Sequence, residues 1–173
     1  VKITVQAVPG TGQGVQVFSA SNDGTVRRWA LAPLPYQQVV DLPGPANSAA
    51  IAADGRSVAV GLDSGGLRLY ALPEMRVVGE QEKAHSTKVK RLSFNADGTL
   101  LASASFDNTA KLWAVAPDGT LTARQTFSGH TDAVHGLAFS PDGTLLATAS
   151  YDGQVGLFTV GTEEKRFIDA HEG

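Results

Sequence analysis

The sequence contains no cysteine, and this absence removes three kinds of chemistry at once. Disulfide bonds, thiolate metal sites and cysteine nucleophiles all require a thiol. Long apolar runs are missing too, because no stretch approaches the ~18 residues that a membrane-spanning helix needs. The chain starts Val-Lys-Ile-Thr-Val, an alternating pattern without the basic and apolar regions of a signal peptide. We therefore expect no membrane association and favour the cytoplasm.

A strong charge of either sign is also lacking. The chain carries 14 basic and 17 acidic residues in 173, a net charge of −3, so no global field attracts nucleic acid or an anionic membrane. Methionine occurs once, whereas glycine occurs 19 times and proline 8 times, which favours a turn-rich β protein over a helical bundle. With 42% hydrophobic and 18% charged residues, the composition is that of a globular domain.

What the sequence does contain is an internal repeat. Residues Val89–Trp113 and Val134–Phe158 align without a gap at an offset of 45 positions, and His85 and His130 share that offset. Two looser copies keep an aspartate turn, an alternating strand and a closing aromatic residue. These copies are Ser19–Trp29 and Asp54–Tyr70, and the four turn aspartates are Asp23, Asp63, Asp107 and Asp152.

Each repeat predicts four short antiparallel strands. In the third unit they cover about 89–94, 100–105, a segment that ends at Trp113, and a segment that ends near Phe127. Asp-Gly pairs between the alternating runs are strong hairpin signals, because glycine tolerates the positive φ of such turns. No apolar stripe of helical period appears, so the fold class is all-β.

These motifs resemble the WD40-repeat family of β-propellers. The resemblance is carried by Gly129-His130, by Phe139–Gly143, by the strands LLASAS and LLATAS, and by the Asp-x5-Trp/Phe ending of the units. It implies four WD40-type propeller blades, each a four-stranded antiparallel sheet, in a single segment that covers 1–173. The blades fall at about 1–41, 42–80, 81–127 and 128–169, and 170–173 begin the loop to a next blade.

His85, Ser103 and Asp107 together have the composition of a hydrolase triad. In the WD40 family, however, residues at these positions form a buried hydrogen-bond network with a tryptophan, here Trp113. The set recurs from blade to blade, which a catalytic site does not do, so the resemblance implies a structural role. The corresponding residues elsewhere are His130, Thr148 and Asp152 in the fourth blade, Ser19, Asp23 and Trp29 in the first, and His171 near the end of the chain.

His171 resembles the loop histidine of a following blade. Three explanations stay open for a run of four blades. The chain is a piece of a longer propeller, or two copies join head to tail in an eight-blade ring in which His171 of one copy completes Ser19, Asp23 and Trp29 of the other. Closure of four blades alone is opposed by the wedge angle of the family's blades.

The resemblance also implies a binding face for proteins or peptides. This face carries the turns that contain the aspartates and the loops between blades, so the residue before each aspartate lies on this face. Neighbouring aromatic residues are common binding anchors. The alternatives are that each ring packs against its own loop and that the lysines form a solvated edge. The candidate residues are Phe106, Tyr151, Asn22, Lys88, Lys90 and His135, and Leu62 has the same position in the second blade.

The sequence therefore predicts a non-catalytic scaffold for protein–protein interaction. The alternative is a sensor or substrate-recognition segment of a larger multidomain signalling enzyme, such as an ATPase, a protease or a kinase. No histidine has a second ligand at metal-binding spacing, and no phosphate-binding glycine motif ends in Lys-Ser/Thr. We accordingly expect neither a metal nor a cofactor.

Overall fold

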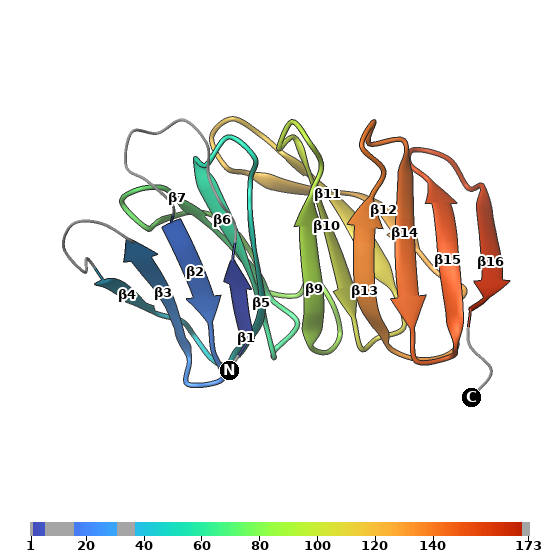
Figure 1. The fold of residues 1–173 in the computed structure, drawn as a ribbon, viewed down its shortest axis with the longest axis horizontal. Helices are drawn as coiled ribbons and strands as arrows, with labels where there is room; N and C mark the ends of the chain where they lie inside the picture. The colour runs from blue at the N-terminus through green and yellow to red at the C-terminus, as the bar shows by residue number, and fades with distance from the viewer. Residues whose placement is uncertain (1, 6–15, 31–36, 171–173) are drawn as a thin grey trace.

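Four antiparallel sheets of four strands each make up the regular structure of the chain (Figure 1). The structure is a computed structural model that describes residues 2–5, 16–30 and 37–170. All the secondary-structure elements in those ranges are β-strands. This confirms the all-β class and the four four-stranded sheets predicted from the sequence. No helix in the described ranges is long and apolar enough to cross a membrane.

The strands follow one another in chain order within each sheet, from the first strand on the inside to the fourth on the outside. The first sheet contains β1 (Lys2–Val5), β2 (Gln16–Ala20), β3 (Thr25–Ala30) and β4 (Gln37–Asp41). The second contains β5 (Ala46–Ile51), β6 (Ser57–Leu62), β7 (Leu67–Ala71) and β8 (Arg76–Gln81). The third contains β9 (Val89–Phe94), β10 (Leu100–Ser105), β11 (Ala110–Val115) and β12 (Leu121–Phe127). The fourth contains β13 (Val134–Phe139), β14 (Leu145–Ser150), β15 (Gln154–Thr159) and β16 (Lys165–Asp169).

Aspartate side chains fix the hairpin turns that the sequence predicts. In the turn between β13 and β14, the Asp142 carboxylate accepts hydrogen bonds from the Ser140 hydroxyl at 2.6 Å and the Thr144 amide at 3.1 Å. These bonds lower the pKa of Asp142 to about 2. Gly143 follows with a φ of 72°, which a residue with a side chain adopts only at a cost. The Asp-Gly pair thus both closes the turn and sets its register.

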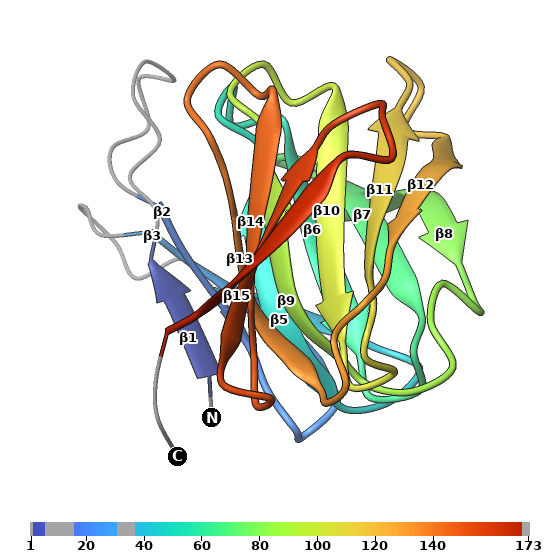
Figure 2. The same ribbon diagram turned by 90° about the vertical axis from the view of Figure 1, so that its right-hand side faces the viewer.

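The sheets stand side by side like the blades of a propeller. Neighbouring sheets meet mainly through their inner strands, β5 against β9 and β9 against β13. Figure 2 looks along this row and shows β5, β9 and β13 gathered on one side, with β8 and β12 on the other. The turns between second and third strands therefore lie at one rim of the row, together with the loops that connect successive sheets. The turns between first and second strands, and between third and fourth, lie at the opposite rim (Figure 1).

Three hydrophobic clusters hold neighbouring sheets together. One joins the first and second sheets around Phe18 and Tyr70, and one joins the second and third around Leu69 and Trp113. The last joins the third and fourth around Phe127 and Phe158, among others. Burial of a large apolar side chain contributes about 1.5–3 kcal/mol, so these contacts are the main source of stability. The treatment of the whole chain as one domain, with the blade limits given above, stays a prediction.

Candidate functional site

The triad-like residues of the third sheet form one connected hydrogen-bond network. His85 lies in the loop before β9, with Nδ1 2.9 Å from Asp107 Oδ2 and Nε2 2.8 Å from Ser103 Oγ. The indole N–H of Trp113 on β11 donates to the same hydroxyl at 2.9 Å. In the tautomer with its proton on Nδ1, the imidazole donates to the carboxylate and its Nε2 accepts the serine proton. The network joins the loop before the sheet, two of its strands and the turn between them.

Burial and charge suit this network to holding a loop in place. Burial alone raises the pKa of the Asp107 carboxyl, but hydrogen bonds from His85, Thr109 and Ser86 outweigh burial and leave the pKa well below its ordinary value. The carboxylate is therefore ionised and acts as an acceptor. Ser103 has no exposed surface, and a nucleophile must reach its substrate. The structural role assigned to these residues from the resemblance stays a prediction, and their geometry is compatible with it.

The fourth sheet repeats the network without the tryptophan. His130 Nδ1 lies 2.8 Å from Asp152 Oδ2, and His130 Nε2 lies 2.7 Å from Thr148 Oγ1. Phe158 stands in the place of Trp113 and cannot donate. The Phe167 ring packs edge-on against His130 instead, with 5.0 Å between the ring centroids. Sequence reasoning missed Phe167, because this ring lies on the outermost strand, β16, where the repeats match poorly.

The first two sheets keep only parts of the set. The Trp29 indole donates to Ser19 Oγ at 3.2 Å, while Asp23 is exposed and binds Thr25 and Arg27. His171 lies outside the described residues. In the second sheet, the Asn47 amide donates to Asp63. The prediction that Asp63 is the turn aspartate of this blade is wrong by one residue, because Ser64 holds the place of Asp107 and Asp152 in the turn. Asn47 was missed for the same reason.

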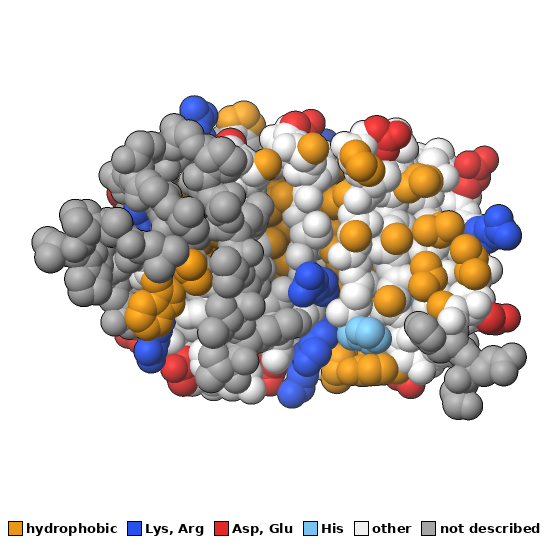
Figure 3. All heavy atoms as spheres, viewed as in Figure 1, with side chains coloured by type: hydrophobic (Ala, Val, Ile, Leu, Met, Phe, Trp, Pro, Cys, Tyr) orange, Lys and Arg blue, Asp and Glu red, His pale blue; other side chains and the backbone are white. Residues whose placement is uncertain are grey.

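Four of the predicted binding residues form a contiguous cluster at the rim of the third and fourth sheets. The rings of Phe106 and Tyr151 pack edge-on with centroids 6.1 Å apart, and the His135 ring lies 4.4 Å from that of Tyr151. The Lys90 ammonium stands 5.3 Å from the centroid of Phe106. Tyr151 remains 60% exposed despite these contacts. Figure 3 shows a histidine beside lysine or arginine and hydrophobic side chains at this lower edge. We call Phe106, Tyr151, His135 and Lys90 the aromatic cluster.

Comparison with known proteins identifies a repeat in part of the chain. The family model described as "WD domain, G-beta repeat" matches residues 78–114 and 121–159, which span most of the third and fourth sheets. These two stretches are WD40 repeats. Such repeats generally mediate protein–protein interaction and are generally non-catalytic.

Two curated proteins of Arabidopsis thaliana resemble parts of the chain. THO complex subunit 3 is 37% identical over 62 residues, which are 35% of this chain and 20% of that protein. SEC12-like protein 1 is 36% identical over 70 residues, which are 40% of this chain and 17% of that protein. The aligned parts thus cover about a fifth or less of the length of these relatives.

The other predicted binding residues lie apart from the aromatic cluster. Lys88 is exposed, but its ammonium forms an ion pair with Asp63 at 3.0 Å. Asn22 is exposed on the turn of the first sheet, and no contact among the described residues links it to the cluster. Leu62 is buried in the core between the first two sheets, so its predicted exposure is wrong. By strand register Leu62 corresponds to Ser105 and Ser150, and Asp63 holds the place of Phe106 and Tyr151.

The described residues also contain no group of three or more His, Asp or Glu side chains placed to hold a metal ion. His85 and His130 use both ring nitrogens within their networks, and His135 packs on Tyr151.

Proposed function

We propose that this chain is a non-catalytic module that binds a protein or peptide partner through the aromatic cluster. The observation that carries the proposal is the contiguity of Phe106, Tyr151, His135 and Lys90 at the rim where two blades meet. Phe106 and Tyr151 occupy the same position in successive blades, yet their rings contact each other. They form one continuous surface across the boundary between the blades.

The chemistry of the cluster suits an apolar group next to an acidic group. Exposed aromatic rings supply large contact area with few rotatable bonds, and such residues dominate binding energies at interfaces. Lys90 places a positive charge over the Phe106 ring, where a carboxylate of the partner can approach. The ion pair between Lys88 and Asp63 marks the border of the surface on the side of the second blade. A partner segment with an aromatic or aliphatic residue beside Asp or Glu fits these features.

Selection of peptides from a random displayed library on the immobilised chain tests this proposal. Selected peptides should contain an apolar residue next to an acidic one. Their affinity should fall at least tenfold for Tyr151→Ala and for Phe106→Ala. Val77→Ala removes an exposed side chain from another edge of the molecule and serves as the matched control. Selected peptides that bind wild type and Tyr151→Ala equally would exclude the cluster as the binding surface.

We also propose that the exposed outer faces of the first and fourth blades are covered by further blades. These blades come from a longer chain or from a second copy of this one. Trp29 and Val39 are exposed on the first blade, and Leu145 and Ile168 are exposed on the fourth. Exposed apolar patches on two opposite faces favour association. The name of THO complex subunit 3 says that this relative is a subunit of a complex, and by extension we propose the same kind of setting for this chain.

A further inference from the structure

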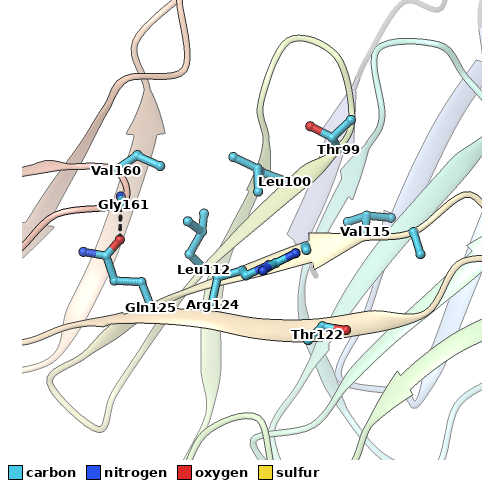
Figure 4. Close-up of a pocket in the computed structure, with 11 residues that line it drawn as sticks. Thr99, Leu100, Leu112, Val115, Thr122, Arg124, Gln125, Val160 and Gly161 are labelled. Carbon is cyan, nitrogen blue, oxygen red and sulfur yellow. Dashed lines mark hydrogen bonds between the residues drawn. The ribbon is translucent and has the colours of Figure 1, made fainter.

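A groove of about 610 Å³ lies between the third and fourth blades, at the rim opposite the aromatic cluster. Figure 4 shows the side chains that line it. Leu100 begins β10 on one wall, while Phe106 follows the other end of that strand, so the two surfaces are separated by its length. We call this hollow the interblade groove.

The corresponding place between the second and third blades is filled. Val78 is the extra residue of a β-bulge, at the register shift between Leu69 and Tyr70. It packs in the same cluster as Leu121, the first residue of β12, which is buried. A Cβ added to Gly119, on the turn before β12, would lie 2.6 Å from Val78 Cβ, so the backbone itself is in contact. Two aliphatic side chains and a glycine close this interface.

At the next interface, between the third and fourth blades, charged residues stand at the positions of Val78 and Leu121. The β11–β12 pair has its bulge at the same place, between Leu112 and Trp113, and the extra residue there is Arg124. The fourth blade has Glu163 and Glu164 in the segment before β16, where the third blade has Leu121, and both acidic residues are exposed. The groove is therefore open because its two filling side chains are missing.

The walls and the charge of the groove define what it can accept. Leu100, Leu112, Val115 and Val160 supply an apolar lining. Arg124 is exposed, and among the residues that line the groove it is the charged one (Figure 4). Glu163 and Glu164 line a separate hollow together with Lys165. The Gly161 amide donates to Gln125 Oε1 at 2.8 Å and ties the two blades together at the rim. An apolar groove with a cation in its lining is complementary to an aliphatic group next to an anion.

We propose that the interblade groove binds a segment of a partner protein in which an aliphatic side chain lies next to a carboxylate. The aliphatic side chain takes the place that Leu121 has between the second and third blades, and the carboxylate pairs with Arg124. This site is independent of the aromatic cluster, and each can fail without the other.

Titration of the full chain with three acetylated, amidated pentapeptides, followed by NMR amide shifts, tests the proposal. The probes are Leu-Asp-Leu-Asp-Leu, Leu-Lys-Leu-Lys-Leu and Ser-Asp-Ser-Asp-Ser. We expect the first to bind most tightly and to shift amides of β10, β11, β12 and the 160–164 turn. Arg124→Glu should weaken it at least tenfold and reverse the preference in favour of the lysine peptide. Arg166→Glu changes an exposed arginine on β16 and should leave the affinity unchanged.

A second variant, Ala114→Trp, fills the groove from β11 and should abolish binding while the unfolding temperature shows that the fold is kept. Equal affinities for the three peptides would overturn the proposal, as would amide shifts confined to the aromatic cluster. Binding that is the same in Arg124→Glu and wild type would also overturn it. Tighter binding of free dodecanoate than of the peptide would assign the groove to a fatty acid and overturn the peptide as its occupant.

Discussion

Asp107 and Asp118 are both turn aspartates of the third blade, but they have different surroundings. Asp107 accepts hydrogen bonds from buried His85, from the Ser86 amide and from Thr109. Asp118 is exposed and accepts from the Thr120 amide at 2.9 Å. Removal of a buried acceptor leaves its donors unsatisfied, at a cost of about 1–3 kcal/mol. We expect Asp107→Ala to lower the free energy of unfolding by this amount and Asp118→Ala by much less.

Urea denaturation of the two variants measures this difference. Asp107→Asn keeps the size of the side chain and still accepts through its amide oxygen, so its loss should fall between wild type and Asp107→Ala. Equal unfolding midpoints for Asp107→Ala and Asp118→Ala would contradict the network as a source of stability.

The same carboxylate predicts how stability depends on pH. The pKa of Asp107 is lowered in the folded chain, whereas an unfolded aspartate has a pKa of about 3.9. The stabilisation from its charge is therefore complete above the unfolded value and is lost as the pH falls towards the lower folded value. The melting temperatures of wild type and Asp107→Asn should differ by a constant amount from pH 7 to pH 5, and the gap should narrow from pH 4 to pH 2. A gap that stays constant over the whole range would contradict this assignment.

At the scale of single residues, the internal repeat made several side-chain contacts predictable. His85, Ser103, Asp107 and Trp113 are brought together as the resemblance implied, because a repeat carries its own spacing. Asn47 was not predictable, since it binds Asp63 from a position where the third and fourth blades have Lys90 and His135. Such a partner is found only when the side chains are placed in space.

Two glycines in the turns between third and fourth strands give a prediction about how neighbouring blades meet. Gly119 and Gly161 have φ values of 92° and 82° and lie between the third and fourth strands of their blades. A Cβ at Gly119 would meet Val78 at 2.6 Å, whereas a Cβ at Gly161 meets no described atom within 4 Å. Alanine is strained by the left-handed backbone at both positions. Gly119→Ala should cost about 1–3 kcal/mol more, because it also overpacks the interface.

Thermal unfolding of the two alanine variants checks this prediction. Val78→Ala in the Gly119→Ala background should recover part of the loss, because it removes the methyl groups that the new Cβ meets. Equal destabilisation at the two glycines would mean that the interblade groove closes in solution, which would also count against its proposed occupant.

The elements themselves were largely predictable, and their contacts were less so. The strands expected at 89–94 and 100–105 in the third unit occur as β9 and β10 with those bounds. Alternation and Asp-Gly turns are local signals, and this accounts for the agreement. The bulge at Arg124 and the groove beside it depend on how two sheets pack. Nothing in the repeat pattern of one blade indicates either feature.

At the scale of the whole molecule, the residues buried between the third and fourth blades have counterparts on the two exposed outer faces. On its third-blade side, Ala102, Ala104, Leu112 and Phe127 are buried. Ala147, Ala149, Leu157 and Ile168 hold the corresponding positions on the outer face of the fourth blade, by strand register and the 45-residue offset. Figure 3 shows hydrophobic side chains gathered over β14 to β16.

The residues on the fourth-blade side of that buried interface have their counterparts on the outer face of the first blade. Leu146 and Phe158 face the third blade in the buried interface, and Val17 and Trp29 hold the corresponding paired positions on β2 and β3. The outer faces of the fourth and first blades therefore match as the two sides of one interface. A head-to-tail pair of chains buries both matching sets, as a ring requires.

This match predicts self-association of the chain when no other blade covers its faces. Light scattering over a concentration series should show a dimer of twice 18.0 kDa that dissociates on dilution. Ile168→Glu places a charge on the outer face of the fourth blade and should weaken the dimer at least tenfold, because an unpaired charge is costly to bury. Glu82→Lys changes an exposed charge in the loop between the second and third blades and should leave the mass unchanged. A mass of 18.0 kDa at every concentration would exclude the ring and leave further blades of a longer chain as the cover for both faces.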